Sequence, residues 1–166
     1  MSAKKTVLQS NSHTMKENTI RSIKVISITA IVMMAIVTSL DTYFWTERWK
    51  NIDWNPEFLN WQRTIVIGHI ASTYLLTAAV ITFIVNVLKN LKKGVIFCRA
   101  NTSVIYAGAA IFFLYSNFAT TAQNAAEGIY VFAIDTNTLI CPLLIIIMGL
   151  LHKLAVEASE ENSLTI

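Results

Sequence analysis

Three ionisable residues lie inside or beside the apolar stretches of this 166-residue chain: Asp41, His69 and Asp135. A charged or strongly polar side chain is costly inside a bilayer, so such residues usually face inward and indicate a functional site. Threonines recur near them at spacings of three and four residues, which places the side chains on the same helix faces. These residues predict a small polar crevice that could bind a proton or a polar ligand, with the candidate members Asp41, His69, Thr73, Thr120 and Asp135.

A simpler interpretation of the same residues stays open. Asp41 and Asp135 would then lie in the headgroup region and contact water, and His69 would only form a hydrogen bond with a neighbouring helix. The two interpretations differ in what mutation of these residues removes. A structural role predicts lost expression, whereas a site predicts normal expression and lost function.

The composition indicates which class of protein must position these residues. Hydrophobic residues make up 54% of the chain and charged residues 14%, against about 45–50% and about 25% in soluble domains. A net charge of +3 gives no basis for direct nucleic-acid binding, and two cysteines are too few for a disulfide-built secreted scaffold. The composition therefore predicts an integral membrane protein that contacts the lipid bilayer.

Four segments are long and apolar enough to cross a membrane as helices, which takes roughly 20 residues each. The spans are predicted at about 25–45, 65–88, 102–123 and 132–154, within a domain covering 25–154. A polar arm (1–24) precedes this domain and an acidic tail (155–166) follows it. A soluble bundle would show a polar face on each helix, but parts of the first and last spans are apolar all round. The predicted fold is an all-α, four-helix bundle in the membrane.

Lysine and arginine are distributed unequally between the two sides of this arrangement. The N-terminal arm, the loop after the second span and the end of the fourth span carry ten of them, and the other side carries three. The positive-inside rule therefore predicts that both termini of this multi-pass membrane protein are cytoplasmic.

The segments between the spans also carry local signals. The first external loop, 41–64, contains all four tryptophans, which indicates anchoring at the membrane interface; an aromatic lid over a ligand is the alternative. Within it, Asn55-Pro56-Glu57 predicts a helix start. Thr102 or Ser103 is predicted to cap the third span, and the small residues Ala107-Gly108-Ala109-Ala110 are predicted to allow close approach of a neighbouring helix.

No complete set of catalytic or metal-binding residues is present in the sequence. Cys98 and Cys141 do not form a CxxC pair, and no nucleotide-binding loop, GxSxG or HExxH motif occurs. His69 and His152 belong to opposite ends of their spans, which is too far apart in depth for one haem iron. We therefore expect no catalytic residues, no metal and no cofactor.

Two motifs lie on the predicted cytoplasmic side, a basic loop LKNLKKGVIFCRAN and an acidic tail ending in EENSLTI. Since they leave adjacent spans on one side, they could pair; a solvated tail and a lipid-facing basic loop is the alternative. The candidate partner-binding motif comprises Gly94, Phe97, Asn101, Glu160, Glu161, Asn162, Leu164 and Thr165.

On these motifs the chain resembles the small bacterial four-span membrane proteins catalogued as domain of unknown function 2975. The family's loop pattern matches at Leu88, Lys89, Gly94, Phe97 and Asn101, and its tail pattern at Glu160, Glu161, Asn162, Leu164, Thr165 and Ile166. Cys98 stands where the family has Thr or Ser. The resemblance implies an inner-membrane protein without established activity, and a small helix-turn-helix regulator as its cytoplasmic protein partner.

The leading interpretation is a non-enzymatic membrane protein whose cytoplasmic loop and tail engage a protein partner. The first alternative is a small transporter or proton-coupled carrier that uses Asp41, His69 and Asp135 in an outward-facing crevice. A membrane enzyme comes third, because no catalytic set is recognisable.

Overall fold

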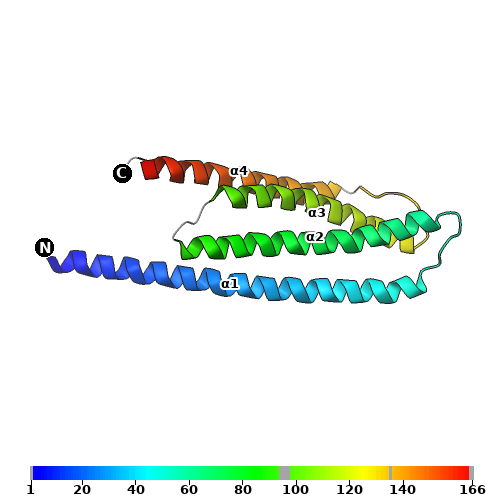
Figure 1. Cartoon of the computed structure of the whole chain (residues 1–166), viewed down its shortest axis with the longest axis horizontal. Helices are drawn as coiled ribbons and strands as arrows, with labels where there is room; N and C mark the ends of the chain where they lie inside the picture. The colour runs from blue at the N-terminus through cyan, green and yellow to red at the C-terminus, as the bar shows by residue number, and fades with distance from the viewer. Residues whose placement is uncertain (1, 94–97, 135, 165–166) are drawn as a thin grey trace.

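The structure is a computed structural model, and it describes residues 2–93, 98–134 and 136–164. These residues form four long helices. The helices are α1 (Ser2–Asn51), α2 (Leu59–Lys92), α3 (Arg99–Ala126) and α4 (Thr136–Leu164). Side chains are described for residues 17–93, 98–134 and 138–161. Each helix contains a segment long and apolar enough to cross a membrane. The all-α, four-helix fold expected from the sequence is confirmed, and both ends of the chain lie at the same end of the molecule (Figure 1).

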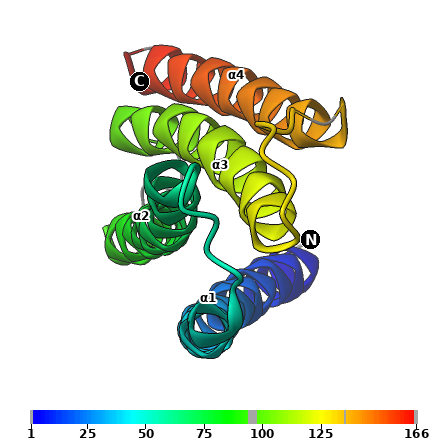
Figure 2. The same cartoon turned by 90° about the vertical axis from the view of Figure 1, so that its right-hand side faces the viewer.

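The helices pack in the order of the sequence. Helix α1 packs on α2, α2 on α3, and α3 on α4, as the end-on view shows (Figure 2). Within the described residues, α1 and α4 are not neighbours. The bundle is therefore open, and its first and last helices each pack against a single neighbouring helix along most of their length.

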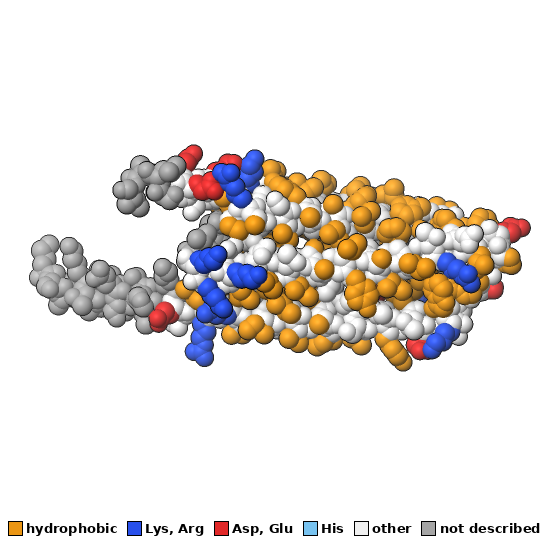
Figure 3. Space-filling model, in the orientation of Figure 1, with side chains coloured by type: hydrophobic (Ala, Val, Ile, Leu, Met, Phe, Trp, Pro, Cys, Tyr) orange, Lys and Arg blue, Asp and Glu red, His pale blue; other side chains and the backbone are white. Residues whose placement is uncertain are grey.

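Apolar side chains are spread along the middle of the face drawn in Figure 3, where the charged side chains lie toward the two ends. On α1 they include Val25, which is 57% exposed, and on α4 Met148, which is 65% exposed. Such a belt would be unfavourable in water, because contiguous apolar patches on soluble monomers rarely exceed a few hundred Å². It fits contact with lipid hydrocarbon, in agreement with the length and composition of the helices.

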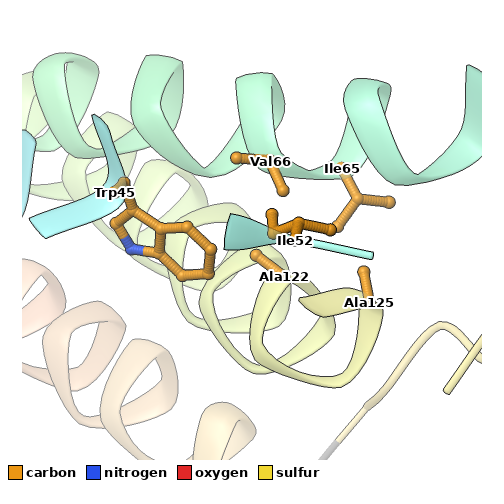
Figure 4. Packing of buried hydrophobic residues seen from close by; sticks show 6 residues of the cluster. All are labelled: Trp45, Ile52, Ile65, Val66, Ala122 and Ala125. Atoms are coloured by element: carbon orange, nitrogen blue, oxygen red, sulfur yellow. The ribbon is translucent and has the colours of Figure 1, made fainter. Parts of the chain in front are cut away.

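The buried apolar core lies near the end of the molecule that is opposite the chain termini. Six residues from α1, the first connection, α2 and α3 form it (Figure 4): Trp45, Ile52, Ile65, Val66, Ala122 and Ala125. Trp45 is only 3% exposed. This tryptophan is a core residue, in contrast to the interfacial anchoring expected for it.

Glycines permit two close approaches between helices. A Cβ on Gly68 of α2 would lie 2.6 Å from the Phe118 ring of α3, and one on Gly149 of α4 would lie 2.7 Å from the Tyr106 ring. A Cβ on Gly108 would meet nothing within 4 Å. Within the predicted contact stretch Ala107-Gly108-Ala109-Ala110, Ala109 is buried, at 2% exposed, whereas Gly108 faces away from the neighbouring helices.

The connection between α1 and α2, at the end of the molecule where the core lies, is shorter than expected. Helix α1 continues to Asn51 and α2 begins at Leu59, so most of the predicted external loop 41–64 is helical. Asn55 does not start the helix: its Oδ1 accepts a hydrogen bond from the backbone N–H of Glu57 (2.9 Å), in a turn that precedes α2. Gly128, with φ of 80°, follows the end of α3 in a conformation that favours glycine.

The predicted acidic tail (155–166) starts inside the last helix, because α4 runs without interruption to Leu164. Helix α3 also starts earlier than expected. Its N-cap position is Cys98, and the hydroxyl of Thr102 lies 2.9 Å from Nδ1 of His152 on α4. The prediction that Thr102 or Ser103 caps this helix is wrong, since both residues lie inside its first turns.

Candidate functional site

The structure brings three of the predicted crevice residues into contact. Asp41 projects from α1 toward α2, where its Oδ2 lies 3.3 Å from Nε2 of His69. The same Oδ2 accepts a hydrogen bond of 3.2 Å from the hydroxyl of Thr73, one turn further along α2. The i, i+4 spacing of His69 and Thr73 places both side chains on the face that meets α1.

His69 is enclosed on both sides by aromatic rings. The ring of Trp45 on α1 lies 5.1 Å from it between centroids, and the ring of Tyr115 on α3 lies 5.6 Å away. The histidine is 2% exposed, whereas the side chain of Asp41 keeps 25% of its surface exposed. The pair therefore has a buried basic member and an acidic member that reaches the surface.

The contact between Asp41 and His69 is an ion-pair approach without hydrogen-bond geometry. Neither ring nitrogen of His69 has a hydrogen-bond partner among the residues described. The backbone carbonyl of His69, in contrast, accepts hydrogen bonds from Ser72 (2.8 Å) and Thr73 (3.1 Å). The backbone carbonyl of His69 therefore has its hydrogen bonds, whereas the imidazole nitrogens can still gain a hydrogen-bond partner.

Polar contacts between α1 and α2 continue on the two turns next to this pair. The hydroxyls of Thr38 and Thr77 lie 2.6 Å apart in a buried contact. The hydroxyl of Thr42 donates a hydrogen bond of 3.1 Å to the phenol oxygen of Tyr74. With Asp41, His69 and Thr73 these residues form a row of polar contacts, which we call the α1–α2 polar ladder.

Two predicted crevice residues are not part of this ladder. The Thr120 hydroxyl donates to the carbonyl of Ser116 on its own helix (3.1 Å), as is common for threonine in membrane helices. Asp135 lies outside the described residues, so the structure does not place it. The described part of the crevice consequently belongs to α1 and α2, with only Tyr115 contributed by α3.

The sequence interpretation missed Gln62, which is 0% exposed at the core end. Its Nε2 donates to the carbonyl of Ala125 at 3.0 Å, and its Oε1 accepts from the backbone N–H of Asn55 at 3.1 Å. Gln62 thus connects α2, the end of α3 and the first connection. Its burial could not be read from the sequence, because Gln62 lies between Trp61 and Arg63 in a segment that resembles an ordinary polar helix start.

Aromatic side chains cover the same end of the molecule. The rings of Phe58 and Tyr130 are stacked, with centroids 4.1 Å apart and planes at 10°. Trp49 and Trp54 are in contact at 4.6 Å, and the guanidinium of Arg63 lies 5.8 Å from the Trp54 ring. These contacts join the two connections at this end, and they occupy the ring faces that an aromatic ligand would need.

At the opposite end, an ion pair joins the basic loop and the acidic tail. The Arg99 Nη2 donates to Glu160 Oε2 at 2.6 Å, and its Nε donates to Oε1 at 3.1 Å. This bidentate arrangement matches the geometry of a guanidinium to that of a carboxylate. Both side chains are largely exposed, at 78% and 48%.

The other residues of the candidate partner-binding motif differ in position. Asn101 is 0% exposed, and neither its Oδ1 nor its Nδ2 has a hydrogen-bond partner within the described part of the chain. Glu161 is exposed on α4. Asn162 and Leu164 belong to α4 but their side chains are not described, and Gly94, Phe97 and Thr165 lie outside the described residues.

The described residues do not bring three histidine, cysteine, aspartate or glutamate side chains together in a group that could hold a metal ion. Asp41 and His69 are an acid and a base in contact, and two such groups can exchange one proton. Comparison of the chain with protein-family models, curated proteins and solved structures found no match.

Proposed function

We propose that the chain is a multi-pass protein of the bacterial inner membrane with both termini in the cytoplasm, and a member of the family catalogued as domain of unknown function 2975. The cation imbalance of ten to three between the two ends of the bundle supports this orientation. A reporter that is active only in the cytoplasm, fused after Ile166, should be active. Activity of a periplasmic reporter at that position would contradict the orientation.

At its cytoplasmic end, the protein acts without catalysis and recruits a protein partner. The observation that carries this proposal is the Arg99–Glu160 ion pair. The pair links the end of α4 to the start of α3, and the acidic segment continues α4 as a helix to Leu164. A preorganised helix loses less conformational entropy on binding than a flexible segment.

The chemistry of this end indicates what the partner offers. Glu157 and Glu161 are exposed on α4, and Lys92 and Lys93 are exposed at the end of α2. A partner with a basic groove would fit the helix, because complementary charge directs association. A small helix-turn-helix regulator, as the family resemblance implies, carries such basic surface for DNA and would be sequestered at the membrane.

Site-specific crosslinking in living cells tests the partner. A photoreactive probe on Cys98, in a Cys141→Ser chain, should give a protein adduct of fixed mass that disappears with Glu160→Arg. The adduct should return in the charge-swapped Arg99→Glu/Glu160→Arg chain if the helix position matters most. A matched probe on Gln123→Cys, which is exposed at the other end, should not give it. Recovery of lipid adducts alone would overturn the proposal.

A second candidate function is a small proton-coupled carrier, and the Asp41–His69 pair favours it. An acid and a base in contact within membrane-spanning helices are the usual parts of a proton relay. The carrier would acidify or alkalinise proteoliposomes on addition of its solute, and Asp41→Asn would abolish the pH change. Absence of pH change with every solute class tried, in protein that folds normally, would leave partner recruitment as the function.

A further inference from the structure

The connection between α3 and α4 presents apolar side chains outward. Residues 128–134 of this connection carry no charge. Four large hydrophobic side chains in it are exposed: Ile129 (48%), Val131 (63%), Phe132 (47%) and Ile134 (65%). A contiguous apolar surface of this kind is unfavourable in water and marks a contact with an apolar partner.

The connection between α1 and α2 has the opposite arrangement. Ile52 is 7% exposed and packs in the core, whereas the charged residues Asp53 and Glu57 are exposed. Both connections lie at the same end of the molecule (Figure 1). This end therefore combines a connection suited to water with one suited to an apolar surrounding.

The outward direction of the apolar side chains is fixed by contacts on the inner side of the connection. Tyr130 and Ala133 are its half-buried members. The ring of Tyr130 stacks on that of Phe58, with centroids 4.1 Å apart, and the backbone N–H of Ala133 donates to the hydroxyl of Thr121 at 3.0 Å. The segment is thus attached to α2 and α3 by the residues that alternate with the exposed ones.

The connection runs back along α3 and does not project beyond its end. The rings of Phe132 and Phe118 are in contact, with centroids 6.1 Å apart, just as Ala133 contacts Thr121. Phe118 lies about 12 Å along the axis from Ala126, the last residue of α3, at a rise of about 1.5 Å per residue. Figure 1 shows that α4 accordingly begins short of the end that the other helices reach. The exposed apolar side chains are therefore level with the last turns of α3.

We propose that residues 129–134 insert into the lipid leaflet at this end of the bundle, with the exposed side chains among the acyl chains just beneath the headgroups. Helix α3 has 28 residues, so it is about 42 Å long, whereas the hydrocarbon core of a bilayer is about 30 Å thick. Its last turn therefore extends into the headgroup region, and the connection beside it lies at the boundary with the hydrocarbon.

Lipid is the partner that fits, because the exposed apolar surface of α4 continues into the connection. Leu139 and Ile140, near the start of α4, are 41% and 49% exposed. The contact of Tyr130 with Trp61, at 6.0 Å between ring centroids, adds the aromatic pair that is typical of the membrane interface. The proposal does not depend on which end of the bundle is cytoplasmic or on partner recruitment.

The backbone of the connection limits how deep the insertion goes. Hydrocarbon offers no hydrogen-bond partners to a non-helical backbone. An extended segment cannot pair its own backbone groups, so those that the bundle does not satisfy need water or headgroups. The insertion is therefore shallow, roughly the 5–10 Å that interfacial helices reach.

Depth measurements by electron paramagnetic resonance test the proposal on the full chain in lipid nanodiscs. A spin label on Val131→Cys, in a Cys98→Ser/Cys141→Ser chain, is compared with the same label on Glu57→Cys, an exposed position in the other connection. Oxygen concentrates in the bilayer, whereas a polar nickel chelate stays in water. We expect oxygen to relax the Val131 label several times more strongly than the chelate does, and the reverse order at Glu57.

A second comparison tests whether the apolar side chains cause the insertion. With the label on Ile134→Cys, Val131→Asp should raise the accessibility to the nickel chelate severalfold, because a carboxylate is unfavourable beneath the headgroups. Val131→Leu is the matched control and should leave it unchanged. If Val131→Asp does not fold, the comparison with Glu57 decides alone.

Two results would overturn the proposal. Equal accessibility of the Val131 and Glu57 labels to the nickel chelate would place the connection in water. Low accessibility of the Val131 label to both reagents, with dipolar broadening in the singly labelled chain, would show that a second copy of the chain covers the connection in place of lipid.

Discussion

Gly149 of α4 lies directly against the ring of Tyr106 on α3, so close that a methyl group at Gly149 would approach Cε1 to 2.7 Å. A methyl group at Gly108 on α3 would meet no heavy atom of a neighbouring helix within 4 Å. The two glycines therefore provide a matched pair for testing how α3 and α4 pack.

Gly149→Ala should destabilise the protein by about 1–3 kcal/mol, the usual cost of forcing an extra methyl group into a packed interface. Gly108→Ala should be neutral or slightly stabilising, because alanine favours the helix by roughly 1 kcal/mol over glycine. Unfolding in a mixed micelle titrated with denaturing detergent measures both values. Equal loss of stability in the two variants would contradict the observed helix faces.

Gln62 gives a second prediction at the core end. Gln62→Ala removes a fully buried amide that serves Ala125 and Asn55; the N–H of Asn55 loses this partner, while the carbonyl of Ala125 still accepts a 3.4 Å hydrogen bond from the N–H of Gly128. The expected loss is about 1–3 kcal/mol for each group that stays buried and unsatisfied. The control is Gln123→Ala on α3, where the side chain is exposed. Unfolding measured by the same detergent titration should separate the two variants clearly; similar stabilities would show that water replaces Gln62.

The sequence predicted the helices and part of the site for physical reasons. A charge-free run such as 65–88 leaves a helix as the only way to satisfy the backbone in lipid. The spacing of His69 and Thr73 placed them on one face, and Asp41 reached them because its helix is the next in the chain.

The rotation of each helix about its axis could not be predicted. Helices α1 and α4 are apolar on nearly all sides, so the sequence holds no periodic signal for the face that meets a neighbour. On α3, the buried member of the predicted small-residue stretch is Ala109 and not Gly108, and Thr120 was expected in a crevice that it does not join. The burial of Gln62 depends on the ends of two other elements and has no local signal.

The ion pair between Arg99 and Glu160 leads to a prediction about local stability. Exposed pairs contribute roughly 0–1 kcal/mol and are screened by salt. Glu160→Gln should therefore leave global unfolding almost unchanged, while amide exchange in 157–161 should become faster by severalfold. Glu157→Gln is the control, since Glu157 pairs with Lys153 of its own helix, at 3.9 Å. In 1 M salt the difference between the two variants should disappear; persistence there would indicate that other contacts hold the end of α4.

Asn101 provides the prediction that separates a structural role from a recognition role at the end of the molecule that carries the chain termini. Its amide is fully buried, and both polar atoms lack a hydrogen-bond partner among the described residues. An unpaired buried amide costs about 1–3 kcal/mol by the measure of protein mutations. Asn101→Leu has a similar volume and no polar atoms, so it should be neutral or should raise stability by an amount of that order. Asn101→Ala should instead lose stability, because it leaves a cavity in place of the side chain.

The same two variants then test recognition. If Asn101 serves only packing, the Cys98 adduct with the partner should persist in Asn101→Leu at normal yield. If the amide is held in reserve for the partner, the adduct should be lost although the protein unfolds at an equal or higher denaturant concentration. A strong loss of stability in Asn101→Leu would contradict both outcomes, since it would mean that the amide has hydrogen-bond partners in the folded protein.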